Sequence, residues 1–281
     1  MINIKYCKEV FLNHIDKYED KTTLGFDLKV KHTFRVMKIS KELCNKLNLS
    51  IEEKKLAQVI ALLHDIGRFE ELLYMKKLDS SKYDHASVGV KLLFEDKVID
   101  KFNIDDKYYN TINKAVLNHS RKTITDDLNE EELIQTKIIR DADKIDNFKL
   151  KIRRKAEECF PGNIFSKEEV ENSLISDKVY LAIMNRECVD VKDRKTSLDL
   201  FICVLGFVYD LNFKESLELV KENNYIKCGP NVSYMKYSND NKNYKEYNKG
   251  ISNIKIEVLS KENLRVCYKT NSKKTICKYI K

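Results

Sequence analysis

A histidine and an aspartate stand side by side at the end of an apolar run, in the stretch Leu62-Leu63-His64-Asp65-Ile66-Gly67-Arg68. An unpaired carboxylate is costly to bury, and a countercharge or a metal ion is the usual compensation. Adjacent His and Asp side chains at a helix end can both close on one ion. The pair His64-Asp65 therefore indicates a metal site in this chain.

Further histidines stand on predicted helices. His32, His64, His85 and His119 each have apolar residues three or four positions away, which share a helix face with them. We expect the four imidazoles to point into a helical bundle, where imidazole and carboxylate together suit iron, manganese, nickel or zinc. His14 shows the same pattern, so periodicity by itself does not separate ligands from core histidines.

Four short stretches carry a family resemblance. They are His32-Thr33-Phe34-Arg35-Val36, Ala61-Leu62-Leu63-His64-Asp65-Ile66-Gly67-Arg68, Asp84-His85-Ala86-Ser87-Val88-Gly89 and Asp141-Ala142-Asp143-Lys144. In this order they resemble the HD-domain superfamily of metal-dependent phosphohydrolases, over about residues 25–155. The variant is the one with two more histidines between the HD pair and the closing aspartate.

The resemblance implies an all-α bundle of the HD type and a site with two metal ions. The first ion would be held by His32, His64, Asp65 and Asp143. The second would be held by His85 and His119 together with Asp65, whose two oxygens make it the natural bridge. The ions expected are divalent transition metals, namely iron, manganese, nickel or zinc, with magnesium as a further candidate.

The identity of the closing aspartate is the least certain ligand assignment. Asp141 and Asp143 differ by about 200° around a helix, so the two cannot both face one ion. Asp141 lies nearer the apolar stripe of this segment, whereas the resemblance selects Asp143. We follow the resemblance, and place Asp146 on the same face as Asp143.

Two basic residues beside the expected ligands are candidates for contact with an anionic substrate. Arg68 follows the HD motif at a position where relatives often carry a lysine, and Lys144 follows the closing aspartate. Together with Asp65, they are the predicted catalytic residues. The alternative for Arg68 and Lys144 is an ordinary ion pair, for example between Arg68 and Glu70 or Glu71.

The function predicted first is hydrolysis of a nucleotide or another small phosphate ester by a metal-activated water. Two alternatives stay open. The ligand order also resembles the di-iron oxygenases of the superfamily, and a non-catalytic regulatory module could keep the same fold.

Composition limits the partners. The 281 residues include 52 basic and 44 acidic side chains, for a net charge of +8, but lysines are spread evenly and no arginine-rich run occurs. We therefore do not expect nucleic acid as a partner.

The stretch 198–208 is too short to span a bilayer, so no membrane is expected. Eight cysteines without a C-x-x-C motif, and no signal peptide, predict a cytoplasmic protein. The oligomeric state is left open.

Only two prolines and seven glycines occur, which favours helices. A capping box at Ser50 and Glu53 predicts the start of the helix that carries His64, which Gly67 should end. We expect a loop over 68–82. The expected helices are 4–18, 27–47, 51–64, 84–96, 105–120, 130–156, 167–185, 196–209 and 213–223.

A change in composition after Tyr225 divides the chain. We expect an HD-type helical domain over 1–225, with helices added after the motif core, and an appendage over 226–281. Alternating segments at 254–258 and 264–268 predict a small β-hairpin there. A poorly ordered tail is the alternative.

Overall fold

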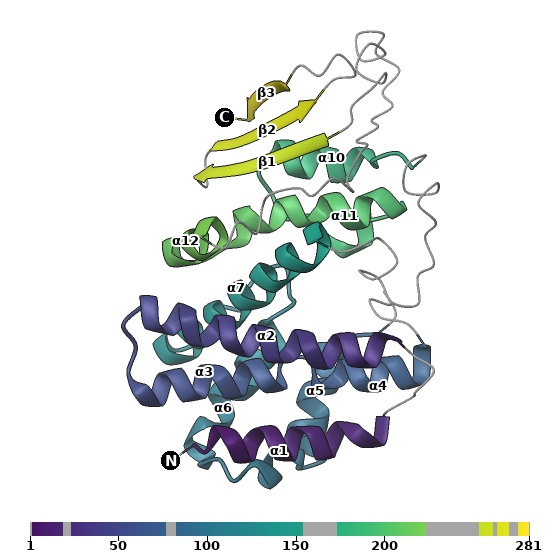
Figure 1. Cartoon of the computed structure of the whole chain (residues 1–281). Helices are drawn as coiled ribbons and strands as arrows, with labels where there is room; N and C mark the ends of the chain where they lie inside the picture. The colour runs from purple at the N-terminus through teal and green to yellow at the C-terminus, as the bar shows by residue number, and fades with distance from the viewer. Residues whose placement is uncertain are drawn as a thin grey trace. The chain divides into compact units, whose positions relative to one another are not determined.

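The structure is a computed structural model (Figure 1), and it describes residues 2–18, 24–76, 83–153, 173–222, 253–260, 263–269 and 275–280. By backbone proximity the chain divides into two compact units, Met1–Asp146 and Asn147–Lys281. The domain boundary predicted near residue 225 stays a prediction.

The α-helices of the described residues are α1 (Ile4–Ile15), α2 (Leu24–Lys46), α3 (Ile51–Leu63), α4 (Ile66–Met75), α5 (His85–Val90), α6 (Tyr109–Asn118), α7 (Glu130–Arg153), α10 (Asp177–Met184), α11 (Ser197–Gly206) and α12 (Lys214–Glu222).

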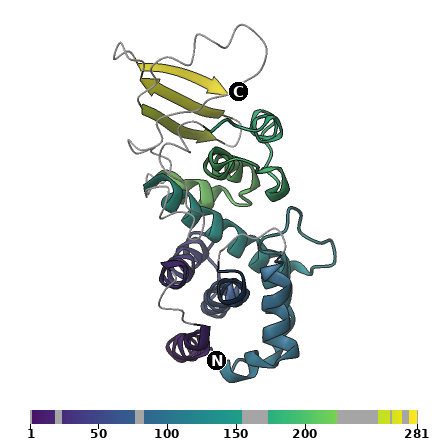
Figure 2. The same cartoon turned by 90° about the vertical axis from the view of Figure 1, so that its right-hand side faces the viewer.

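The first unit is a helical bundle, as predicted. Helices α2 and α3 pack along one another, α1 packs against α3, and α5 contacts both α4 and α6. In Figure 2, α1 and α2, in purple, are seen end-on at one side of the unit, and the blue and teal helices lie beside them. Phe11 of α1 is fully buried and meets Phe34 and Phe69 edge-on, at ring-centroid distances of 6.3 and 5.7 Å. This aromatic contact joins α1, α2 and α4.

Helix α3 begins where the capping box predicted. The Glu53 backbone N–H donates to Ser50 Oγ at 3.2 Å, and the Ser50 N–H donates to Glu53 Oε2 at 2.8 Å. The residues from Leu56 to Leu63 are nearly all buried. The helix therefore carries His64 into the interior of the bundle.

The break after α3 differs from the prediction. The helix ends at Leu63, and Asp65 leaves helical geometry with φ −110° and ψ 20°. Gly67 lies inside α4 rather than ending α3, and the loop predicted over 68–82 is wrong for residues 68–75. The prediction missed α4 because charged residues alternate with its apolar ones. Ile66, Phe69 and Leu72, three residues apart, all lie buried on one face of this helix.

Gly67 lets α4 and α5 approach closely. A Cβ atom at this position would overlap the carbonyl oxygen of His85 and lie 2.8 Å from the backbone nitrogen of Gly89. Both obstacles are backbone atoms, which cannot rotate away. The absence of a side chain at Gly67 therefore allows the backbone at His85 to lie close to α4.

Most of the remaining predicted helices are found with bounds shifted by a few residues, but the helix predicted over 167–185 is wrong for residues 173–176, and residues 154–156 of the helix predicted over 130–156 lie outside the described residues. The helix predicted over 84–96 is α5 followed by a π-helical turn, Lys91–Glu95. The helix predicted over 167–185 is described only from residue 173, and it begins at Asp177. Among the described residues, every helix is too short or too polar to cross a lipid bilayer.

In the second unit, Asp199 is the charged residue within the apolar stretch 198–208, and its hydrogen bonds explain why it is buried there. Its buried carboxylate accepts hydrogen bonds from the backbone N–H groups of Ser176, Lys195 and Thr196. It also accepts one from the Ser176 hydroxyl at 2.6 Å. The carboxylate thus satisfies the donors that precede α10 and α11. The apolar cluster beside it is Ile175, Val179, Ile183, Val189 and Cys203.

The predicted hairpin is confirmed. Strand β1 (Asn253–Ser260) pairs antiparallel with β2 (Asn263–Lys269), with Ile254 opposite Tyr268 and a register shift between Val258 and Ser260. A third strand, β3 (Thr275–Ile280), which was not predicted, pairs antiparallel with β2. The sheet order is β1-β2-β3.

The close approach at Gly67 gives a stability prediction. Alanine is intrinsically better than glycine within a helix by about 1 kcal/mol. Gly67→Ala should nevertheless lower the free energy of unfolding by about 1–3 kcal/mol, because backbone atoms must move apart. The matched control is Gly89→Ala, whose Cβ would lie 3.3 Å from a methyl group of Ile66. Urea unfolding should place this control within about 1 kcal/mol of the parent protein. Equal stability of the two variants would contradict the close approach.

Candidate metal centre

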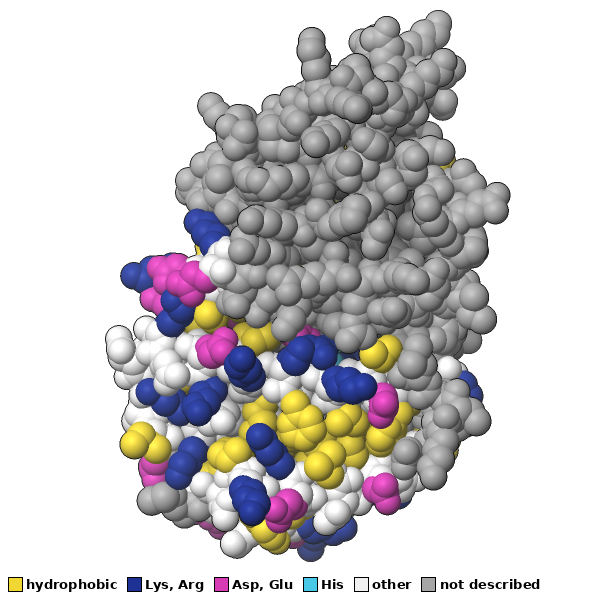
Figure 3. Space-filling model, viewed as in Figure 1, with side chains coloured by type: hydrophobic (Ala, Val, Ile, Leu, Met, Phe, Trp, Pro, Cys, Tyr) yellow, Lys and Arg dark blue, Asp and Glu magenta, His cyan; other side chains and the backbone are white. Residues whose placement is uncertain are grey.

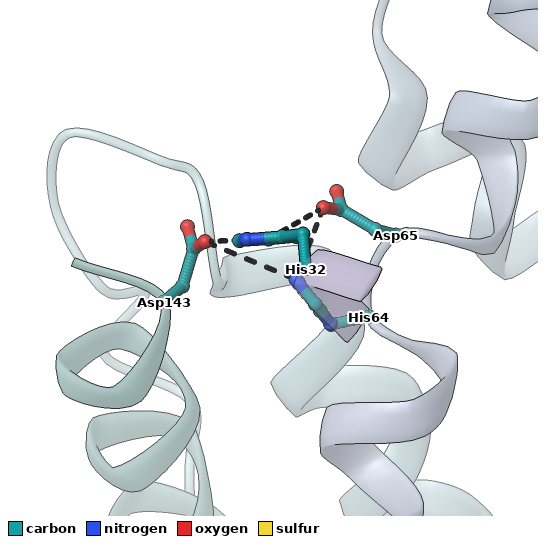
Figure 4. A group of neighbouring side chains, drawn as sticks. All are labelled: His32, His64, Asp65 and Asp143. Carbon is teal, nitrogen blue, oxygen red and sulfur yellow. Dashed lines mark ion pairs between the residues drawn. The ribbon is translucent and has the colours of Figure 1, made fainter. Parts of the chain in front are cut away.

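Four side chains from three parts of the first unit converge (Figure 4). His32 comes from α2, His64 and Asp65 from the α3–α4 junction, and Asp143 from α7. His32 Nε2 lies 3.1 Å from Asp143 Oδ1 and 3.4 Å from Asp65 Oδ2. His64 Nε2 lies 3.0 Å from Asp65 Oδ2 and 4.0 Å from Asp143 Oδ1. We call these four residues the first ligand group.

A second ligand group, Asp65, His85 and His119, shares one residue with the first. His85 opens α5, and His119 follows the last residue of α6. Their Nε2 atoms lie 3.1 Å apart, and they are 3.4 and 3.5 Å from Asp65 Oδ1. Asp65 therefore directs Oδ2 to one group and Oδ1 to the other.

The histidine rings are oriented by hydrogen bonds on their far side. His64 Nδ1 lies 2.8 Å from the Ala61 carbonyl oxygen, and His119 Nδ1 lies 2.6 Å from that of Val116. A carbonyl can only accept, so each of these Nδ1 atoms carries the proton and each Nε2 keeps its lone pair. His64 Nε2 is buried and has no hydrogen-bond partner. The lone pairs thus face the carboxylates, as metal ligation requires.

His32 is oriented by a carboxylate instead. Its Nδ1 lies 2.8 Å from Asp146 Oδ2, and Asp146 is fully buried. Arg35 donates to both oxygens of Asp146, at 2.7 and 2.9 Å. A carboxylate behind a ligating histidine fixes its ring and raises its basicity. The position of Asp146 on the face of Asp143 was predicted, whereas its pairing with Arg35 was not.

The spacing of the donor atoms fits metal ions. Ligand atoms about 2.1 Å from one ion lie about 3 Å apart when their bonds form a right angle. The short separations, 3.0–3.4 Å in the first group and 3.1–3.5 Å in the second, are close to this value. Imidazole nitrogen with carboxylate oxygen is a donor set for divalent transition metals. Both groups therefore fit the ions that the sequence predicted.

The electrostatics of the site favour a cation. Burial would raise the pKa of Asp65, but His64 and Lys29 hold it well below its usual value, and His32 does the same for Asp143. Burial would lower the pKa of His32, but the carboxylates around it raise it to about 10. Asp65 and Asp143 are thus favoured as carboxylates, the form in which they bind a cation, and any second proton on His32 would be displaced by an entering metal ion.

The two predicted substrate contacts have different surroundings. Arg68 Nε lies 3.7 Å from Asp65 Oδ1, and its guanidinium donates to the buried Glu71 at 2.6 Å. This is the ion pair that the sequence offered as the alternative for Arg68, yet it leaves the arginine beside the ligands. Lys144 is buried on α7 next to Asp143. Its role in substrate binding stays a prediction.

The two candidates for the closing aspartate, Asp141 and Asp143, have different positions in the structure. Asp143 lies in the first ligand group, whereas Asp141, although buried, lies in neither group of the described residues. Spacing alone favoured Asp141 because the apolar stripe marks the packed face of α7. Here the ligand lies beside that stripe rather than on it.

Two residues near the centre were not predicted. Lys29, one helical turn before His32, forms an ion pair with Asp65 Oδ2. Arg140 is buried and donates to the carbonyl oxygens of Asn118 and Arg121, on either side of His119. Each lies three residues before a ligand on the same helix, Lys29 before His32 and Arg140 before Asp143. Residues three apart share a helix face, and this spacing could have indicated both.

Comparisons with known proteins agree with this geometry. Residues 30–147 match the family model described as HD domain, and the matched segment contains every member of both ligand groups. No curated protein and no solved structure matches the chain.

The two aspartates of α7 supply a prediction. Asp143→Asn should weaken metal binding at the first group by about 10-fold to 100-fold or more, because an ionised ligand is lost. Asp141→Asn is the matched control, because it makes the same change two residues earlier on α7, at a side chain outside both ligand groups, and it should change the affinity much less. Metal titration of the folded variants measures both. The opposite ranking would show that helix periodicity identifies the ligand better than the position of Asp143.

Proposed function

Since residues 30–147 carry an HD domain, a family that includes metal-dependent phosphohydrolases, we propose that this protein is a metal-dependent phosphohydrolase. Its substrate would be a nucleotide or another small phosphate ester. The observation that carries the proposal is the shared carboxylate. Asp65 offers one oxygen to each of two histidine-containing ligand groups, as a residue that bridges two metal ions must.

Two divalent ions are proposed for the working site. His32, His64, Asp65 and Asp143 would hold the first, and Asp65, His85 and His119 the second. Bound metal supplies a water of lowered pKa and positive charge for the phosphoryl oxygens. The protein then needs no nucleophilic side chain.

The residues of the chain would position these parts. Asp146 and Arg35 hold the ring of His32, while the carbonyl groups of Ala61 and Val116 hold those of His64 and His119. Buried, oriented ligands lose little freedom when an ion binds, so the arrangement is preorganised. Arg68, held by Glu71 and lying beside Asp65, would contact a bound phosphate, because a guanidinium fork matches phosphate oxygens.

In the space-filling view (Figure 3), many lysine and arginine side chains lie on the described face, among acidic and apolar ones. Cationic side chains at a surface attract anionic ligands, of which a small phosphate ester is one.

The proposal is tested on protein purified without a chelator. Its metal content is measured, and it is then assayed for phosphate release from mono- and diesters with manganese, iron, nickel, cobalt or magnesium. Phosphate release in the absence of oxygen supports hydrolysis. Substrate conversion that requires oxygen would instead support the di-iron oxygenase alternative, and metal binding without turnover would support a regulatory module.

Asp65→Ala should remove both bound metal and phosphate release, while circular dichroism shows the helix content retained. Asp65 lies at the junction of two helices and holds the ligand groups together rather than the bundle. Asp105→Ala, an exposed acid elsewhere in the same unit, is the control and should keep metal and activity. A full metal content in Asp65→Ala would contradict the bridging role.

The double variant His85→Ala and His119→Ala tests the second ion. It should keep about one ion per chain, since the first group retains its four members. Phosphate release should fall much further than metal content, because two-metal hydrolysis depends on both ions. Two ions per chain in the double variant would show that these histidines do not hold metal.

A further inference from the structure

Lys29 occupies an unusual position for a lysine. Its ammonium forms an ion pair with Asp65 Oδ2, and only 14% of its side chain is exposed. The same oxygen lies 3.0 Å from His64 Nε2 and 3.4 Å from His32 Nε2. The lysine therefore contacts the atom that would bridge to the first ion.

A neighbour on the same helix shows that this contact is not an ordinary surface pair. Lys31 has 62% of its side chain exposed and lies 3.7 Å from Asp27, which is itself exposed. Burying an ammonium is costly unless it is paired.

Lys29 and a metal ion at the first group would compete for one oxygen. An ammonium has three donors and no lone pair while it is charged, so it cannot share Asp65 Oδ2 with a second cation without repulsion. The flexible four-carbon stem allows the ammonium to move away from that oxygen while α2 stays in place. Metal binding would therefore release the Lys29 ammonium beside the ligand groups.

A second cation stands on the other side of the same carboxylate. Arg68 Nε lies 3.7 Å from Asp65 Oδ1, and 14% of the Arg68 side chain is exposed. The two cations come from α2 and α4, and each flanks one oxygen of Asp65. Both cations therefore lie close to the carboxylate that the two ligand groups share.

We propose that Lys29 is a substrate-binding residue with two positions, on Asp65 in the metal-free site and on the phosphoryl oxygens of the substrate in the loaded site. This inference rests on the proposed phosphohydrolase function for the identity of the anion. In the metal-free protein the ammonium neutralises Asp65. In the loaded protein it contributes, with Arg68, to binding of phosphate.

The proposal predicts opposite effects of one substitution. Lys29→Met keeps a long apolar stem and removes the charge. Metal affinity at the first group should rise about tenfold, because the competing cation is gone. Affinity of the metal-loaded protein for inorganic phosphate should fall about tenfold, because a charge-assisted contact is lost. Isothermal titration with manganese, and then with inorganic phosphate, measures the two separately.

Two further variants serve as controls. Lys31→Met removes a lysine of the same helix that faces solvent, and it should change neither affinity. Lys29→Arg keeps the charge and should bring both affinities back toward those of the parent protein. If Lys29→Met does not fold, as seen by circular dichroism, Lys29→Gln replaces it in the same titrations.

The results separate this inference from the function on which it rests. A Lys29→Met variant that loses affinity for both metal and phosphate would show a structural role and overturn the proposal. Unchanged affinity for phosphate would overturn it as well. Failure of the phosphohydrolase proposal would appear differently, as a parent protein that binds metal but releases phosphate from no ester.

Discussion

The buried carboxylate of Asp65 is the constraint on which this site depends. It lies between two helices, with four histidines around it and only 3% of the residue exposed. A charge in this position requires cations close by, because water cannot solvate it. Lys29 forms an ion pair with this carboxylate, and the guanidinium of Arg68 lies close to it. The imidazole of His85 also faces it.

Helix ends bring the ligands to this carboxylate. His64 follows the end of α3, His85 opens α5, and His119 follows the end of α6, while His32 and Asp143 project from within longer helices. Near a helix C-terminus the carbonyl groups of Ala61 and Val116 are available to accept the Nδ1–H of a histidine. The same local geometry thus places the ring and selects the nitrogen that stays free.

The residues behind the ligands are held by contacts of their own. Arg35 and Asp146 hold His32, Arg140 binds carbonyl groups on both sides of His119, and Gly67 allows α5 to come close. These contacts join α2, α4, α5, α6 and α7. The site is therefore a product of the packing of the whole first unit, and its donor spacing follows from that packing.

The sequence by itself determined the helical class, the capping box of α3 and the β-hairpin, because helix period, cap chemistry and strand alternation are local properties. The six residues of the ligand groups were selected by the family resemblance, which rests on the order of the histidines and aspartates along the chain. The sequence pattern did not reveal α4, whose apolar face is masked by charges, or the third strand. Spacing alone favoured Asp141 over Asp143, whereas a ligand is selected by the residues that face it across the bundle. The ion pair of Lys29 with Asp65 and the fork of Arg35 on Asp146 join residues 36 and 111 positions apart. Only the tertiary structure could decide these contacts, because a charged side chain takes its partner from the elements that packing brings beside it.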